Sequence, residues 1–327
     1  MTMKKLADLA NVSKSTISKA FSGSPDISKK TRDHIFQIAK EHGCYDKYNK
    51  KPFDKKIIAV ICPEINSEDY TSIVNLLMNF LDERNAMMLL STSSFNETKE
   101  KDIYKYFSTY GKTDGIIIVN TLGLYSKEEV IIPTVSMFAR HNSAAIDNVD
   151  FSTNEAMQNI ISTLKEFGHK QIGFAGEPLT TTSQSLFKQT ARKSAISLND
   201  TSIKVSRKRF EEAGRDVVRQ WIAEGTLPTA IVAAYDYIAI GIMKELSQNN
   251  LQVPKDVSVV GINDITLSSF IEPTLSSVKY PNEELCQEAV SLLFKKIDNR
   301  YYRARHITKI PAQFIPRDSI GPVKKDF

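Results

Sequence analysis

The 327-residue sequence lacks the features that would point to a membrane-embedded, secreted or metal-binding protein. No stretch approaches the roughly 18 apolar residues that a membrane-spanning helix needs. Lysines near the start have no apolar segment behind them, so we expect no secretory signal. The three cysteines, Cys44, Cys62 and Cys286, show no metal-ligand spacing and cannot all pair. These absences favour a reducing, cytoplasmic location and predict neither a metal site nor a cofactor.

Common catalytic motifs are absent as well. The sequence has no glycine-rich phosphate loop, no His-x-x-x-His pair and no Gly-x-Ser-x-Gly elbow. Its five histidines are isolated: His34, His42, His141, His169 and His306. We therefore expect no catalytic residues and a protein that is not an enzyme.

Positive charge is concentrated in the first part of the chain. The whole chain carries a net charge of +5, whereas residues 1–56 hold 13 lysines and arginines against six acids, a net of +7. A basic head on a slightly acidic body predicts a polyanionic partner for the head. A lysine-rich surface that only meets solvent is the alternative.

Three short helical patterns fill residues 1–44. Residues 2–9 form the first, and Ser13 is the expected N-cap of the second, whose Ile17, Ala20 and Phe21 share one face. The third pattern follows Ser28, repeats apolar residues at helical spacing and ends at Gly43. Two short helices followed by a third predict a helix-turn-helix unit.

The second helix turns polar side chains outward. With its apolar face inward, it presents Lys14, Ser15, Ser18 and Lys19. Short hydroxyls and amines can donate hydrogen bonds to phosphates and base edges, and a helix fits the major groove of DNA. Plain polar surface is the alternative interpretation.

A basic segment, residues 45–56, separates this head from an α/β body that begins at Ile57. Apolar runs such as "IIAVIC", "GIIIVN" and "QIGFAG" alternate with helical patterns from there on. Continuous apolar strands between helices are typical of parallel sheets covered on both faces. About 270 residues exceed one comfortable sheet, so two α/β lobes are expected.

Several stretches together resemble one known family. "MKKLADLANVSKSTISKAFSGSPDISKKTRDHIFQIAKEHG", "TDGIIIV", "LKEFGHKQIGFAG", "PTAIVAAYDYIAIGIMKEL", "VPKDVSVVGINDI", "EPTLSSVKYP" and "IPRDS" occur in the order found in the LacI/GalR family of bacterial transcription regulators. The resemblance covers essentially the whole chain. It implies a DNA-binding headpiece (1–44), a hinge (45–56) and a two-lobed effector-binding and dimerisation body (57–327) like the periplasmic sugar-binding proteins.

The resemblance also implies that the chain crosses between the lobes three times. We place the crossings near 151–154, 276–279 and 306–309. Lobe 1 then comprises about 57–151 and 279–307, and lobe 2 about 152–278 and 308–322.

By the resemblance, Lys14, Ser15 and Lys19 read bases. Many relatives have arginine where Lys19 stands, and lysine lacks the fork that pairs bidentately with guanine. The positions where phosphate contacts are usual in the family are Thr2, Ser13, Thr16, Ser18, Ser22 and Ser28. Ser13 and Ser28 could equally be helix caps only.

The hinge departs from the family pattern. Only 11 residues, 46–56, separate Tyr45 from the first body strand, about one helical turn fewer than usual. The segment has no leucine to wedge into the minor groove, and Pro52 cannot sit inside a helix. Tyr48 or Phe53 is a candidate wedge, and a linker without regular structure is the alternative.

The effector residues implied by the resemblance depart as well. "EINSEDY" leaves Tyr70 as a stacking ring, an ungapped count puts the family's sugar-clasping arginine at Phe187, and Tyr235 and Asn263 replace a common Asn and a common Asp. The full candidate set is Tyr70, Phe138, Arg140, Gln184, Phe187, Lys188, Tyr235, Asp236, Asn263 and Asp264. Structural roles for Asp236 and Asp264, and core packing for Phe138 and Phe187, stay open.

We therefore expect a homodimeric, sequence-specific transcription regulator that binds double-stranded operator DNA. It would be a repressor of carbohydrate-utilisation genes, controlled by a small molecule, a sugar or sugar derivative, between two lobes. The alternative is a sugar-binding protein of the periplasmic-binding type whose DNA binding is lost or weak. The sequence leaves open the effector, the operator and whether effector releases DNA or promotes binding.

Overall fold

A computed structural model describes residues 1–48, 54–139, 143, 145–299, 302 and 306–324. The chain forms two compact units, 1–56 and 57–327, which are treated separately below. No helix in the described part is long and apolar enough to cross a bilayer.

The first unit, which we call the headpiece, is a small all-α bundle. Its helices are α1 (Met3–Leu9), α2 (Lys14–Phe21), α3 (Lys29–Glu41) and the single turn α4 (Tyr45–Tyr48). Thr2, Ser13 and Ser28 cap the first three helices, each accepting a backbone N–H three residues on. Leu6, Ile17 and Ile35 meet in the core with no exposed surface. The predicted helix-turn-helix unit is confirmed.

Tyr48 belongs to this core, which corrects its assignment as a candidate groove wedge. Its hydroxyl donates to the Met1 carbonyl at 2.9 Å, and its ring lies 5.8 Å from that of Phe21. A ring held in this way is not available to enter a minor groove without leaving the bundle. Phe53, the other candidate, lies outside the described residues.

In the second unit, the body, lobe 1 is a six-stranded sheet in the order β11-β5-β4-β3-β1-β2. Its strands are β1 (Lys56–Cys62), β2 (Ala86–Thr92), β3 (Gly115–Val119), β4 (Thr134–Met137), β5 (Asp147–Ser152) and β11 (Ile307–Pro311). The β1–β3, β3–β4, β4–β5 and β5–β11 pairs are parallel. The lobe's helices are α5 (Glu68–Glu83), α6 (Glu97–Lys105), a π-helical turn (Tyr106–Tyr110) and α11 (Asn282–Asp298).

Alternate residues of β1 enter two separate cores, so both faces of this sheet are covered. Ile58 and Val60 pack with α5 and α11, whereas Ala59 and Ile61 pack with Tyr104 of α6. Burial on both faces explains why the strand reads as an unbroken apolar run.

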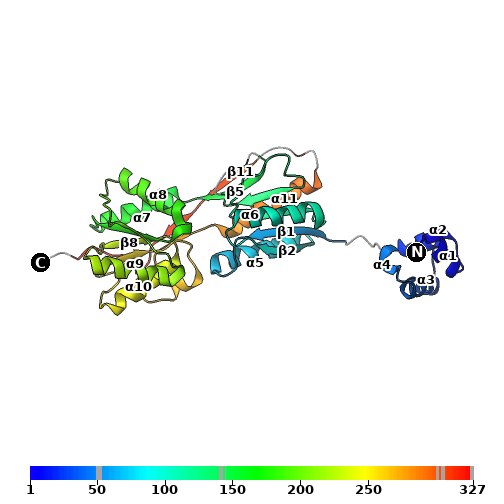
Figure 1. Ribbon diagram of the computed structural model, residues 1–327. Coiled ribbons are helices and arrows are strands. Elements are labelled where there is room, and N and C mark those ends of the chain that lie inside the picture. The colour runs from blue at the N-terminus through cyan, green and yellow to red at the C-terminus, as the bar shows by residue number, and fades with distance from the viewer. Residues whose placement is uncertain (49–53, 140–142, 144, 300–301, 303–305, 325–327) are drawn as a thin grey trace. The chain divides into compact units, whose positions relative to one another are not determined.

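Lobe 2 has a four-stranded parallel sheet in the order β7-β6-β8-β9. Its strands are β6 (Ile172–Gly176), β7 (Ile203–Val205), β8 (Ala230–Ala233) and β9 (Ser258–Val260), with the antiparallel pair β10 (Ser277–Lys279) and β12 (Gln313–Ile315) beside β9. Helices α7 (Asn154–Glu166) and α8 (Thr181–Lys193) lie on one side of the strands, and α9 (Phe210–Glu224) and α10 (Asp236–Gln248) on the other (Figure 1). Two 3-10 turns, Pro178–Thr180 and Thr266–Ser269, complete the lobe. The predicted α/β class with parallel sheets is confirmed.

The third crossing between the lobes lies later than the sequence suggested. We expected it at 306–309, with 308–322 in lobe 2. However, β11 pairs with β5 up to Pro311 opposite Ser152, and Ala312 is the first residue to enter the core of lobe 2. The crossing was placed too early because the end of β11 is hard to recognise from the sequence. Its five residues alternate between exposed and half-buried, so this edge strand lacks the unbroken apolar run of the central strands.

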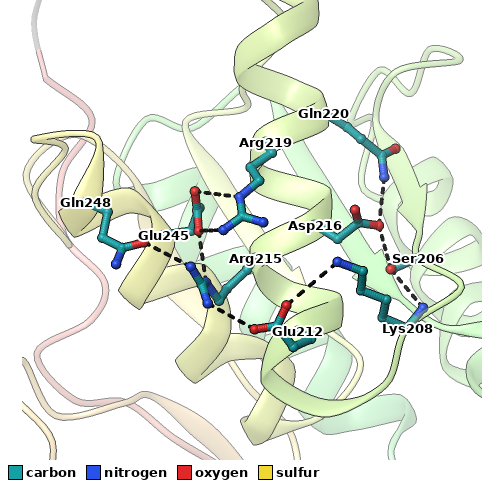
Figure 2. Close-up of polar contacts among 9 residues, drawn as sticks. All are labelled: Ser206, Lys208, Glu212, Arg215, Asp216, Arg219, Gln220, Glu245 and Gln248. Carbon is teal, nitrogen blue, oxygen red and sulfur yellow. Dashed lines mark hydrogen bonds and ion pairs between the residues drawn. The ribbon is translucent and has the colours of Figure 1, made fainter.

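Helices α9 and α10 are in backbone contact. A Cβ added to Gly214 would lie 2.0 Å from the Ile238 carbonyl oxygen, and one added to Gly241 would lie 2.0 Å from that of Glu211. A polar network flanks the contact (Figure 2). Arg219 of α9 donates two hydrogen bonds to the Glu245 carboxylate of α10 at 2.8 Å, and Arg215 Nε donates a third at 3.0 Å. The glycines therefore set the distance between the helices, and the ion pairs hold the outer side.

Candidate functional site

Helix α2 has one fully buried face and one exposed polar face. Ile17, Ala20 and Phe21 are at most 5% exposed, as predicted. Lys14, Ser15, Ser18 and Lys19 are exposed. The helix is anchored from behind and offers two amines and two hydroxyls to a partner.

The N-terminus of α2 carries a cluster of hydroxyls. Ser13 Oγ accepts the Thr16 N–H at 3.0 Å and lies 2.7 Å from Ser15 Oγ and 2.8 Å from Thr16 Oγ1. Ser13 is thus a cap, and its neighbours' hydroxyls are held at the positive end of the helix, where phosphate oxygens bind well. Thr2 and Ser28 are likewise caps at the surface.

Lys19 is held by an acid within the headpiece. Its Nζ lies 3.1 Å from Asp26 Oδ2, and this contact holds the Asp26 pKa below its usual value. Both side chains are more than half exposed, so the pair is weak and can exchange for another partner. Ser22, at the end of the helix, donates to the Lys19 carbonyl at 3.2 Å.

A cavity of about 360 Å³ lies between the two lobes of the body. Its aromatic wall residues are Tyr70, Phe95, Phe138, Phe151, Phe210, Tyr235, Tyr237 and Tyr280. Its ionisable wall residues of other kinds are Glu64, Asp69, Asp150, Glu177 and Arg209. Rings with a few convergent polar groups are typical of a small-molecule site.

Four residues of the candidate effector set line this cavity, namely Tyr70, Phe138, Tyr235 and Asn263. Tyr70 accepts a hydrogen bond from the Asn120 amide at 2.6 Å, and Tyr235 accepts one from the Phe210 N–H at 3.0 Å. Their phenol oxygens are therefore fixed. Arg140, which follows the wall residue Ala139, lies outside the described residues.

Gln184, Phe187 and Lys188 do not line the cavity, which corrects that part of the prediction. Phe187 is fully buried in the core of lobe 2, 5.4 Å from the ring of Phe174. The wall residues of α8 are Thr182, Ser183 and Leu186. Successive residues of a helix are rotated by about 100° around its axis. An ungapped alignment to the family motif that is wrong by one residue therefore selects a side chain on a different face of α8.

Asp236 and Asp264 also lie outside the cavity wall, so the structural role that the sequence left open applies to both. Asp236 has no exposed surface and accepts from Ser277 Oγ at 2.6 Å, Ser268 Oγ at 2.8 Å and the Ile265 N–H at 2.9 Å. Asp264 pairs with Arg317 at 2.6 Å. Asp236 ties together the segments that form the lobe-2 side of the cavity.

Asp236 predicts a pH effect on stability. Burial raises its pKa from 3.8 to about 7, so the native state binds this proton more tightly than the unfolded chain does. Its contribution to the free energy of unfolding therefore falls as the pH rises from 3.8 to about 7. Asparagine does not titrate, so this pH-dependent decrease should be absent in Asp236→Asn. The free energy of unfolding of the variant, taken relative to wild type, should therefore be higher at pH 8 than at pH 5. Urea unfolding of both proteins at pH 5 and pH 8 measures this difference. If the free energies of unfolding of the two proteins changed equally with pH, Asp236 would not be the group responsible.

A guanidinium joins the lobes across the cavity. Arg209 of lobe 2 forms two hydrogen bonds with Glu64 of lobe 1, at 2.8 and 2.9 Å, and Nε lies 3.3 Å from both oxygens of Glu177. It also lies 4.6 Å from the ring centre of Phe210. Glu64 and Glu177 are 8% and 3% exposed, so the two carboxylates are largely screened from water, whereas the Arg209 side chain remains about one third exposed.

Glu68 makes a second contact between the lobes. It accepts the Thr266 N–H at 2.7 Å and the Thr266 hydroxyl, and its own N–H donates to Tyr237 Oη at 3.4 Å. These bonds and the Arg209 cluster hold the lobes in the arrangement that the structure shows. A ligand that changes either contact changes the relative stability of lobe arrangements.

Strained backbone is concentrated at the cavity. Of the 12 described non-glycine residues with positive φ, five line it: Phe95, Asn120, Phe138, Phe210 and Asn263. Such conformations cost about 1–3 kcal/mol each and persist where the surroundings impose them. Their concentration here supports a binding role for the cavity.

The sequence reasoning missed the charged part of the wall. Glu64 and Asp69 belong to the stretch "EINSEDY", of which only Tyr70 was a candidate, and Arg209 lies outside the stretches that carry the family resemblance. The stretch "KRFEE" could have indicated a polar site at the start of α9. In it, Arg209 and an aromatic residue directly precede the two acids of the first helical turn. Glu177 follows the apolar strand "IGFAG" in the same way, at the end of a parallel strand where ligands commonly bind.

Two family models match the chain. Residues 2–45 match "Bacterial regulatory proteins, lacI family", and residues 161–320 match "Periplasmic binding protein-like domain". A relative from Bacillus subtilis (strain 168), the NTD biosynthesis operon regulator NtdR, is 25% identical over 97% of this chain and 99% of its own length.

Two solved structures share the fold over almost the whole chain. A lac repressor dimer bound to operator and the anti-inducer ONPF has a TM-score of 0.73 at 20% identity, covering 98% of each chain. A complex of the transcriptional regulator CelR with cellobiose has a TM-score of 0.69 at 20% identity, covering 98% of this chain and 99% of the other. The solved structures show the shared fold, whereas the family models place residues 2–45 in the lacI family of bacterial regulatory proteins and residues 161–320 among periplasmic binding protein-like domains. Together with a relative of similar length, they show that the chain is a LacI-type DNA-binding transcription regulator rather than an enzyme.

Proposed function

We propose that the protein is a repressor of carbohydrate-utilisation genes whose affinity for operator DNA is controlled by a small molecule in the cavity between the lobes. The observation that carries this proposal is the division of α2 into a buried apolar face and an exposed face of Lys14, Ser15, Ser18 and Lys19. Such a helix can enter a major groove while its back remains packed. Two proteins of similar fold, a lac repressor bound to operator and the regulator CelR bound to cellobiose, support the repressor and sugar parts of the proposal.

In this proposal Lys14, Ser15 and Lys19 contact bases, and hydroxyls at the helix ends contact phosphates. The hydroxyl set is Thr2, Ser13, Thr16, Ser18, Ser22 and Ser28. Lysine contacts release counterions from DNA, so affinity should fall steeply with salt.

We further propose that the protein acts as a homodimer on a pseudo-palindromic operator, because two headpieces are needed to read two half-sites. The body offers an apolar surface for association at Phe270, which is 79% exposed, and Leu267, which is 42% exposed. Sedimentation of the full chain measures the oligomeric state.

Coupling between the cavity and DNA follows from the contacts between the lobes. A ligand that stabilises one lobe arrangement shifts operator affinity by the difference in its affinity for the two arrangements, typically about 1–3 kcal/mol. Titrating operator affinity against candidate ligands gives the sign of the effect.

Selection of binding sites from random duplex DNA by the full-length protein tests the proposal. An enriched palindrome would support it, and the spacing of the half-sites would show how the short connection between the headpiece and β1 is used. If neither the free protein nor the protein with a bound ligand enriches any sequence, the proposed operator binding is wrong.

Lys19 provides a residue-level prediction. Lys19→Ala should lower the preference for operator over random duplex by about 1–3 kcal/mol, because a base contact is lost in addition to a charge. Lys19→Arg is the matched control, since it keeps the charge and adds a fork that can pair with guanine. Competition binding at fixed salt measures the preference. An equal loss on operator and random DNA would show that Lys19 contacts only phosphate.

A further inference from the structure

The cavity wall carries more negative than positive charge. Four carboxylic acids line it, Glu64, Asp69, Asp150 and Glu177, against the single arginine Arg209 among the described wall residues. An anionic ligand would enter this cavity against its charge.

The one cation in the described wall is already neutralised. Arg209 holds Glu64 through two hydrogen bonds and lies 3.3 Å from Glu177, so its charge is matched by two buried carboxylates. A sugar phosphate or sugar acid at Arg209 would therefore meet a cation whose charge two carboxylates already balance. With two glutamates sharing one guanidinium, that cluster keeps one negative charge, and Asp69 and Asp150 add two more.

These two acids differ in their partners. Burial raises the pKa of Asp150, although two contacts offset part of this effect: its Oδ1 accepts the Phe151 N–H at 2.9 Å, and Lys309 of β11 lies opposite it in the sheet register. Asp69 forms no ion pair with any lysine or arginine in the described part of the chain, and burial raises its pKa to about 6. Asp69 is thus the acid whose negative charge lacks a counterpart.

Two buried oxygens of the wall lack hydrogen-bond donors. Asp69 Oδ1 and Asn282 Oδ1 are both screened from water and have no partner in the described residues. The Asn282 side chain also forms a hydrogen bond to Asp69, so the two groups are neighbours. Buried acceptors without donors are costly, and an N–H-rich group placed between them removes that cost.

The surrounding rings suit a cation as well. Tyr70, next to Asp69, lies 6.0 Å from Phe95 at a steep angle, and the ring of Tyr280 stacks on that of Phe151 at 4.1 Å. Aromatic faces attract cations, as Arg209 already shows over Phe210 at 4.6 Å.

We propose that the effector is an aminated sugar or a similar small polyol ring bearing a protonated amine, and that Asp69 and Asn282 receive its ammonium group. This inference rests on the proposed function of the cavity as the effector site. The ammonium supplies donors to the two buried oxygens and a positive charge to Asp69, while the ring lies among the aromatic side chains.

Calorimetric titration of the full chain with matched sugars tests this inference. The probes are glucosamine with glucose, galactosamine with galactose, N-acetylglucosamine as an uncharged amide, and glucuronate as an anion. The aminated member of at least one pair should bind about tenfold or more tightly than its neutral parent, because hydrogen bonds from a charged donor are stronger than those from a neutral one. N-acetylglucosamine should behave like the parent. Equal or tighter binding of the neutral or anionic sugars, or no binding of any aminated probe, would overturn the inference.

Asp69→Asn isolates the contact. It removes a buried charge that has no ion-pair partner among the described residues, so the variant should be at least as stable as wild type at pH 8. The informative quantity is the ratio of the affinities for the aminated sugar and its neutral parent. The variant's affinity for the aminated probe should fall about tenfold. Asp102→Asn, at an exposed position of α6, is the control and should change neither value. Equal losses for neutral and aminated sugars in Asp69→Asn would show that Asp69 only shapes the site.

Site selection on random duplex DNA separates this inference from the proposed function. A neutral sugar that binds and alters operator affinity would leave the proposed function intact and exclude the ammonium. Tight binding of an aminated sugar with no enriched DNA sequence would support the ligand class and exclude the operator function.

Discussion

Gly241→Ala should destabilise lobe 2 by about 3 kcal/mol or more, which is at the upper end of the cost of overpacking. The added Cβ would lie 2.0 Å from the Glu211 carbonyl oxygen and 2.7 Å from its carbon, both backbone atoms that cannot rotate away. Relief requires α9 and α10 to separate, which would stretch the ion pairs of Glu245 with Arg215 and Arg219 (Figure 2). The melting temperature should fall by roughly 6–12 °C.

Calorimetric melting of the full chain measures this loss. Lys244→Ala, at an exposed position of the same helix, is the matched control and should melt close to wild type. Gly214→Ala should lower the melting temperature in the same way, because the added Cβ on α9 would lie against the Ile238 carbonyl oxygen of α10. A Gly241→Ala protein that melts like wild type would mean that the helices are farther apart than the structure has them.

Removing residues 1–56 should abolish operator binding while ligand binding by the body survives. All the residues proposed to contact DNA lie in this unit, which has its own core and is compact by itself. The cavity is built wholly from residues of the second unit, whose cores also lie within it. The loss should exceed any single substitution, because base and phosphate contacts disappear together.

Fluorescence anisotropy with the selected operator measures DNA binding, and calorimetry measures the retained ligand affinity. The matched control is the full chain with Lys14, Ser15 and Lys19 changed to alanine, which keeps the fold of the headpiece and should lose most of its sequence preference. A truncated body that still binds the operator would show that the headpiece is not the DNA-binding unit.

Much of the fold could be predicted from the sequence because its signals are local. Ser13 and Ser28 precede helical apolar repeats and cap the helices as expected, and the unbroken run of β1 correctly indicated a strand buried on both faces. The polar face of α2 followed from the same periodicity. These features depend on residues near one another in the chain, so a periodic pattern is sufficient to identify them.

The cavity depended on the tertiary structure. Tyr70, Phe138, Tyr235 and Asn263 could be named as candidates, but Phe187 and its neighbours on α8 were misplaced because a single helical residue changes the face. The pairing of Arg209 with Glu64 joins side chains 145 positions apart, which no local pattern encodes.

The sequence by itself determined the class of this protein: a helix-turn-helix with a polar outer face on an α/β body, the pattern of the lacI family. Only the tertiary structure decided the character of the ligand site. Charge balance is a property of groups brought together in space, and Asp69, Asp150, Glu177 and Arg209 meet only when the two lobes close around them. Electrostatic interactions fall off with distance in space and not along the chain, and this is why the sequence could name the fold while the site's charge had to be read from the structure.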